Sequence, residues 1–348
     1  MGQGGRNPTF GNRASRRETA SAVLDFKPER EAAQLGNPSS AQPSVDPRTS
    51  SIRPIIQTLV SIAADHGSSI SSAELLVLLP EGVFDSSADL ESFVEGDASL
   101  GHDLRVLDGQ ITLRGFERLA SGRPDQIRLS DQRALAAQEF SNRLIIACPW
   151  IRVIGISGST AYGGSKSQDD VDFYLITGRN RLWITLLFAM ISARFHRLKS
   201  SDSPQFCFNR ILEEYECRDA FRSNKDPLFA REALNLRILQ GGDYFRELLS
   251  SATWMERLFP VLFRQAFGPA MVRTPNVEKA NHRVWSIVNG VAFAGLAPYL
   301  TIVGMWRNHR LLRAGRVDAR FRTITRRGFF AYESKKYDLL RDTYSKVF

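Results

Sequence analysis

The chain has 348 residues, 43% hydrophobic and 24% charged, which is ordinary for a soluble globular protein and leaves room for two domains. Its net charge of +9 favours polyanionic partners (nucleic acid, nucleotides or an anionic membrane surface), or else reflects solubility and a basic tail. Three cysteines without a C-x-x-C pair exclude a disulfide framework, and five scattered histidines argue against a zinc site.

Residues 1–50 are rich in Gly, Ser, Pro, Asn and Arg and contain few large apolar residues. This composition predicts a disordered tail, because it cannot bury enough apolar surface to fold. The tail has no apolar segment typical of a secretory signal. We therefore expect a cytoplasmic protein whose cysteines stay reduced.

Residues 51–122 contain signals for three helices followed by a hairpin. Apolar residues at helical spacing predict the first helix, and Ser71 with Glu74 forms a capping box for the second. A serine at 86–87 begins the third. The run LRVLDGQITLRG then predicts a hairpin with a type I′ turn at its central DG.

Three helices followed by a hairpin resemble a winged helix, a fold that often binds DNA. The third helix is acidic and would repel phosphate, since it contains Asp89, Glu91 and Glu95. We therefore favour a winged-helix-like module that docks a protein or positions a substrate, and nucleic-acid binding is the less favoured alternative.

A helix predicted over 131–147 leads into an apolar strand, a small-residue bend and a pair of aspartates. The sequence reads VIGISGSTAYGGSKSQDDVDF, with ten residues between Ser159 and Asp170. Alternation along a strand places Asp170 and Asp172 on the same side, about 7 Å apart. Paired carboxylates suit hard divalent cations. The bend at Gly158 offers N–H groups and a hydroxyl to phosphate oxygens.

This Gly-Ser bend, gap and Asp-x-Asp resemble the signature of the DNA polymerase β-like nucleotidyltransferase superfamily, with the gap of its minimal bacterial members. The resemblance implies an α+β fold in which residues 123–225 form a palm-like mixed sheet with flanking helices. It also implies that Asp170 and Asp172 bind Mg²⁺ or Mn²⁺, while Gly158 and Ser159 contact the triphosphate of an NTP.

The implied reaction moves a nucleoside monophosphate from an NTP to an acceptor hydroxyl, with both aspartates catalytic. The acceptor could belong to a small molecule, an RNA or a protein. Lys166, in the loop before the aspartates, could reach a phosphate or be solvated. Arg179 and Arg181, at the start of an amphipathic helix, could contact the nucleotide. The oligomeric state is left open.

The superfamily pattern adds a third carboxylate on a later strand, predicted here over 205–212. Asn209 stands where an acidic residue is expected, and an amide cannot act as a base. Glu213 is our candidate for the missing catalytic carboxylate, with Glu214 and Asp219 as alternatives. The departure keeps two other functions open: a catalytically silent nucleotide-binding sensor or adaptor, and a nucleic-acid-binding regulator.

Residues 226–348 are predicted to be helical, with a first helix that begins at Pro227 and ends at Gly241-Gly242. The resemblance implies that this region shapes the acceptor pocket. Four side chains are candidates for that role: Arg231, Glu232, Arg237 and Trp254.

The segment 286–306 contains no charged residue and is long enough to span a membrane. A span would export residues 307–348, whose twelve Lys and Arg against four Asp and Glu oppose the positive-inside tendency. We therefore favour a buried helix that completes a helical domain or a dimer interface. A true span and an in-plane membrane contact remain as alternatives, so the cytoplasmic protein could be membrane-associated.

Overall fold

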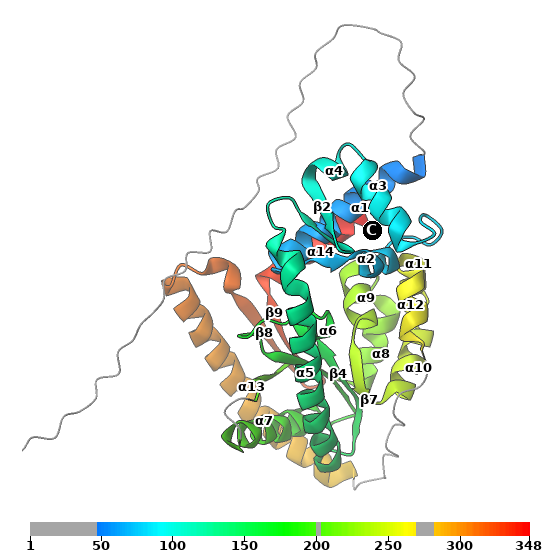
Figure 1. Ribbon diagram of the computed structural model, residues 1–348. Coiled ribbons are helices and arrows are strands. Elements are labelled where there is room, and N and C mark those ends of the chain that lie inside the picture. Colours follow the sequence, from blue (N-terminus) through cyan, green and yellow to red (C-terminus); the bar gives the residue numbers. More distant parts are fainter. Residues whose placement is uncertain (1–46, 200–202, 269–281) are drawn as a thin grey trace, which may run out of the picture. The chain divides into compact units, whose positions relative to one another are not determined.

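A six-stranded mixed sheet forms the centre of the computed structural model, which describes residues 47–199, 203–268 and 282–348 (Figure 1). The strand order is β7-β4-β5-β6-β9-β8, and only β5 and β6 run parallel. The strands are β4 (Ile151–Ser157), β5 (Val171–Thr177), β6 (Phe206–Glu213), β7 (Arg237–Gln240), β8 (Phe321–Arg326) and β9 (Phe329–Ser334). The expected α+β fold with a mixed sheet and flanking helices is confirmed.

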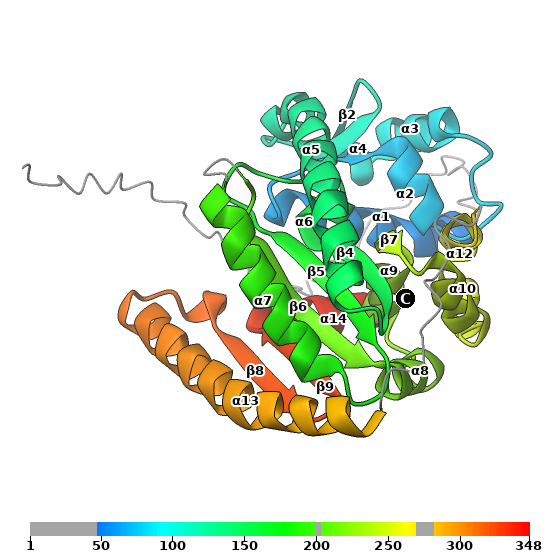
Figure 2. The ribbon, with the colours of Figure 1, turned by 90° about the horizontal axis from the view of Figure 1, so that it is seen from below.

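Helices cover both faces of this sheet, because alternate strand residues are apolar on both sides. Figure 2 shows α5 (Arg118–Ala147), α7 (Leu182–Lys199) and α13 (His282–Arg313) across one face, where they bury Phe173 and Leu175 of β5. Tyr174 and Ile176 of the same strand face the other core. That core is covered by α8 (Glu214–Ser223), α9 (Pro227–Leu234), α10 (Gly242–Ser250) and α14 (Lys335–Val347).

The N-terminal part combines short helices with a three-stranded antiparallel sheet of order β1-β3-β2. Its elements are α1 (Pro47–Asp65), β1 (Ile70–Ser71), α2 (Ser72–Leu78), α3 (Ser87–Gly96), α4 (Leu100–Asp103), β2 (Leu104–Leu107) and β3 (Gln110–Leu113). The predicted capping box of Ser71 and Glu74 is confirmed. The predicted hairpin turn has φ values of +49° at Asp108 and +71° at Gly109, as type I′ requires.

Helix α5 begins earlier than the predicted 131 and runs across the expected domain boundary at 122/123. Arg123 explains this extension. Its buried guanidinium donates to Glu74 of α2 at 2.5 Å and to the Tyr162 carbonyl at 2.9 Å, which fixes the first turns of the helix between the two sheets.

The described residues all belong to one compact unit, 45–348. The predicted tail falls outside them, apart from residues 47–50.

The C-terminal region is helical as predicted but also contributes three strands to the sheet. The expected helix from Pro227 to Gly241 ends at Leu234, and β7 follows it. Gly241 then turns the chain into α10 with φ +79°, and a side chain here would meet the Arg152 carbonyl oxygen at 1.8 Å. After α10 come the short helices α11 (Trp254–Leu258) and α12 (Pro260–Ala266). Helix α13, the 3-10 turn η1 (Val317–Ala319) and α14 complete the helices of this region.

Candidate functional site

Asp170 and Asp172 lie at the beginning of β5 and point toward the same side of the sheet. The Cys207 thiol donates to Asp170 Oδ2 at 3.1 Å, and the Asn209 amide donates to Asp172 Oδ1. Cys207 and Asn209 are two residues apart on the neighbouring strand β6, so their side chains share a face. The two carboxylates therefore share that face too, as strand alternation led us to expect.

The predicted bend lies directly against this pair. Gly158 has φ +63° and begins the short helix α6 (Gly158–Ala161). A side chain at Gly158 would meet Asp172 Oδ2 at 2.5 Å, so the bend backbone lies in contact with the carboxylate. The backbone carbonyl of Ser159, which is partly buried, accepts the Gly164 N–H at 2.8 Å, and this bond closes the loop beside the site.

This contact makes Gly158→Ala more damaging than the same change at a glycine with free space around it. Gly82 is the matched control, because it has φ +77° and no atom within 4 Å of an added Cβ. We expect Gly82→Ala to cost about 1 kcal/mol of unfolding free energy and Gly158→Ala about 2 kcal/mol more. Urea unfolding of both variants measures this difference. Equal losses would show that the bend does not touch Asp172.

The electrostatics of the site favour a bound cation. Burial, assisted by the charges of Asp170, Asp169 and Glu232, raises the pKa of Asp172 to about 7. Ionised Asp172 therefore lacks compensating positive charge. Burial and the nearby Asp170 raise the pKa of the Cys207 thiol to about 12, so this sulfur remains a protonated donor. A protonated thiol does not bind a metal, so the donors that remain at the site are oxygens, which suit a hard cation.

The side chains at this site suit Mg²⁺ better than they suit a metal whose ligands all come from the protein. Within 47–199, 203–268 and 282–348, no group of three or more His, Cys, Asp or Glu is placed to hold a metal ion. Mg²⁺ commonly uses one or two carboxylates and completes its shell with water and substrate phosphates. Asp170 and Asp172 can supply that pair, with the remaining positions left for a triphosphate.

Lys166 takes a different position from the one that we expected. Its backbone N–H donates to Asp169 Oδ2 at 2.9 Å, so Asp169 caps the turn before β5. A side chain at Gly67 would meet the Lys166 ammonium at 2.5 Å. The ammonium therefore lies against the loop between α1 and β1.

The four candidate side chains of the acceptor pocket separate into different roles. Glu232 lies near enough to raise the pKa of Asp172, and it accepts the Tyr162 hydroxyl at 2.8 Å. Arg231 is partly buried, and its guanidinium lies 5.0 Å from the centre of the Tyr162 ring. By contrast, Arg237 pairs with Asp131 at 2.9 Å. Trp254 donates to the Phe221 carbonyl at 2.7 Å and packs against the core.

Glu213 does not lie with the aspartates, so our assignment of it as the third carboxylate is corrected. It pairs across the strands with Thr177, at the far end of β5 from Asp172, about 16 Å along the strand. Glu213 is 1% exposed and accepts the N–H groups of Arg181 at 3.1 Å and Leu182 at 3.4 Å. It thus caps the first turn of α7.

The alternatives to Glu213 also lie elsewhere. Glu214 is ion-paired with Arg152 at 3.3 Å, and Asp219 is exposed on α8. Arg179 and Arg181 follow the far end of β5, so neither is placed to contact a nucleotide at Asp172. The group on β6 that bonds to Asp172 is Asn209, which stands at the position where the resemblance implied a third carboxylate.

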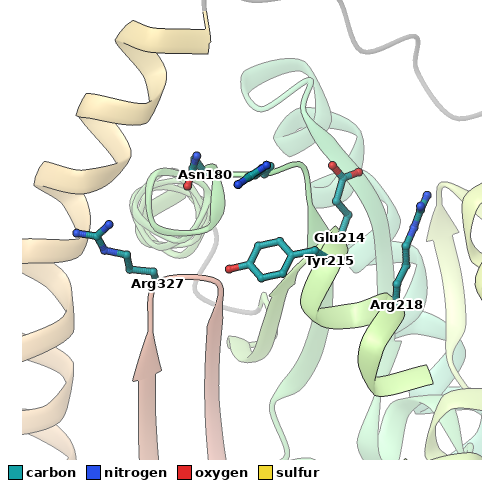
Figure 3. A pocket seen from close by; sticks show the side chains of 6 residues that line it. Asn180, Glu214, Tyr215, Arg218 and Arg327 are labelled. Carbon is teal, nitrogen blue, oxygen red and sulfur yellow. The ribbon is translucent and has the colours of Figure 1, made fainter. Parts of the chain in front are cut away.

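A cleft with a volume of about 640 Å³ opens at this far end of the strands (Figure 3). Its lining residues are Arg179, Asn180, Glu214, Tyr215, Arg218 and Arg327. Three arginines against one glutamate make it suited to an anion. No local sequence pattern indicates this cleft, because Arg218 and Arg327 come from separate elements. It contains no pair of carboxylates for a metal.

Comparison with known proteins gives no relative for this chain. No family model, no curated protein and no solved structure matches it.

Proposed function

We propose that the chain is a Mg²⁺-dependent nucleotidyltransferase that transfers a nucleoside monophosphate from an NTP to an acceptor hydroxyl. One observation supports this above the others. Asp170 and Asp172 face the same side at the start of β5, with the Gly158 bend in contact with Asp172. A cation site beside a bend that offers backbone donors is what phosphoryl transfer requires.

In this proposal each residue around the bend has a defined role. Asp170 and Asp172 hold Mg²⁺, which when bound neutralises the phosphates and aligns the α-phosphorus with the acceptor oxygen. Asn209 donates to Asp172 Oδ1 and orients that carboxylate. The Gly158 and Ser159 segment contacts the phosphates. The acceptor oxygen bonds to the α-phosphorus, the bond to the bridging oxygen breaks, and pyrophosphate leaves.

The sheet and the N-terminal part take their roles from the same proposal. The strands β4, β5 and β6 form a polymerase β-like palm, since they carry the bend, the aspartates and Asn209 side by side. The helices and hairpin of residues 51–122 form a winged-helix-like module that positions the acceptor or docks a partner. The acidic α3, with Asp89, Glu91 and Glu95, supports a partner other than nucleic acid.

A nucleotide-binding sensor without chemistry is the second candidate, and Asn209 favours it. Its amide donates to Asp172 at the position where the superfamily pattern has a third carboxylate. An amide cannot accept the proton of the acceptor hydroxyl. In the enzyme, that proton must therefore pass to an aspartate or to water.

Removal of Mg²⁺ tests the proposal directly. The purified chain, incubated with labelled NTPs and cell extract as a source of acceptors, should release pyrophosphate and label one extract component. Chelation with EDTA should stop the release, and excess Mg²⁺ or Mn²⁺ should restore it, because without a cation the two carboxylates repel the triphosphate. Calorimetry separates the candidates: NTP binding without pyrophosphate release identifies the sensor.

A further inference from the structure

Helix α13 is held along one side by the rest of the protein. Asn289, 6% exposed, accepts the N–H groups of Trp183 at 2.8 Å and Ile184 at 3.1 Å, and so caps the start of α7. Near the other end of the helix, Asn308 Oδ1 accepts the Phe321 N–H at 3.1 Å. These bonds to buried polar groups tie α13 to both α7 and β8.

The opposite side of α13 is apolar and exposed. Its large side chains are each 53–68% exposed: Val284, Ile287, Val291, Tyr299, Ile302, Met305 and Trp306. Most of them are three or four residues apart, and the eight-residue step from Val291 to Tyr299 equals two such intervals. They therefore form one stripe, about 33 Å long at 1.5 Å per residue. A stripe of this length is larger than the scattered apolar residues of an ordinary surface.

Positive charge adjoins the stripe, and no acidic residue lies between 282 and 317. Arg307, Arg310 and Arg313 follow the apolar segment on exposed positions. The Arg310 guanidinium lies 4.5 Å from the centre of the Trp306 ring, which brings cation and aromatic side chain together at the end of the stripe. Tryptophan and arginine together are typical of helices that lie at a lipid headgroup surface.

We propose that α13 docks in the plane of an anionic lipid bilayer, with its apolar stripe among the acyl chains and its arginines on the headgroup phosphates. The alternative of a transmembrane span conflicts with the bonds of Asn289 and Asn308, which a span would break. A second copy that packed its own α13 against this one would bring no acidic side chain to the arginines, because residues 282–317 contain none. Lipid phosphates supply that charge. The proposal does not depend on nucleotidyl transfer.

Vesicle flotation of the full chain tests it. We expect binding to vesicles that contain phosphatidylserine, and weak binding to phosphatidylcholine alone. Ile302→Ser combined with Met305→Ser should reduce binding at least about tenfold, since two partly inserted apolar side chains are lost. Arg310→Gln with Arg313→Gln should reduce only the phosphatidylserine-dependent part, also about tenfold. Leu339→Ser on α14 is the matched control, because Leu339 is 64% exposed outside α13.

Two results with vesicles and one result without lipid would overturn the proposal. One is unchanged binding of the Ile302 and Met305 variant, which would assign membrane affinity to another part of the chain. The other is absence of binding to anionic vesicles by a folded wild-type chain. Sedimentation velocity without lipid tests whether a second copy of the chain covers the apolar stripe instead. A dimer that the same variant dissociates would show that α13 covers a second copy instead.

Discussion

Replacement of Asp170 and Asp172 together by asparagine is expected to reduce pyrophosphate release by at least about a thousandfold. Both side chains keep their shape and can still accept the bonds from Cys207 and Asn209. They lose the two negative charges that hold Mg²⁺, and removal of a metal's carboxylates removes most of its contribution to the transition state. Initial rates of pyrophosphate release at saturating NTP and Mg²⁺ measure the loss.

The neighbouring Asp169→Asn is the matched control. Asp169 accepts the Lys166 N–H through one carboxylate oxygen, and an asparagine oxygen can do the same. We expect its rate to stay within about threefold of the wild type. Retained turnover in the double variant, or an equal loss in the control, would remove the aspartates from the proposed mechanism.

The double variant should not lose activity by unfolding, because the charge of Asp172 opposes folding. The pKa of Asp172 is raised to about 7 from an ordinary value near 3.8. The folded state therefore binds this proton more tightly than the unfolded state does, and the stability that the proton supplies is lost as the pH rises through 7. At pH 8 without Mg²⁺, the variant should be more stable than the wild type by on the order of 2 kcal/mol.

Glu213→Ala is expected to lower the free energy of unfolding by about 3 kcal/mol without changing turnover per folded molecule. The change leaves the buried N–H groups of Arg181 and Leu182 without an acceptor and opens a cavity at the start of α7. Urea unfolding at pH 7, with rates corrected for the folded fraction, measures both quantities.

Glu213→Gln separates the structural role from a catalytic one. Its side-chain oxygen can still accept from Arg181, and burial already raises the pKa of Glu213 and disfavours its charge. We expect this variant to recover most of the stability, with a loss below about 1 kcal/mol. If Glu213→Gln were stable but inactive, the far end of β6 would have to be part of the reaction.

The elements around the site could be predicted where the signal is local. The Gly158 bend, the alternation that sets Asp170 and Asp172 on one side, the capping box at Ser71 and the hairpin turn at Asp108 all follow from residues a few positions apart. Each depends on backbone conformation or strand pleating, which neighbouring residues determine directly.

The residue patterns alone could not predict the long-range partners, and Asn209 was singled out only through the superfamily resemblance. The contact of Asn209 with Asp172 spans 37 positions and depends on the parallel register of β5 and β6. The same register places Glu213 at the opposite end of the strand, although its distance in sequence from Asn209 is only four residues. A short sequence interval along an extended strand is a long distance in space.

The order of residues is enough to define the apolar segment 286–306 and the acidic pair beside a glycine bend. Packing of the folded chain settles which side of that segment is covered, through the bonds of Asn289 to α7. It also settles which acidic residues lie near enough for their charges to raise the pKa of Asp172. Local patterns fix conformation because they act through adjacent peptide units. Pairing between distant strands and helices is fixed only by the packing of the whole core, since many registers satisfy the same local pattern.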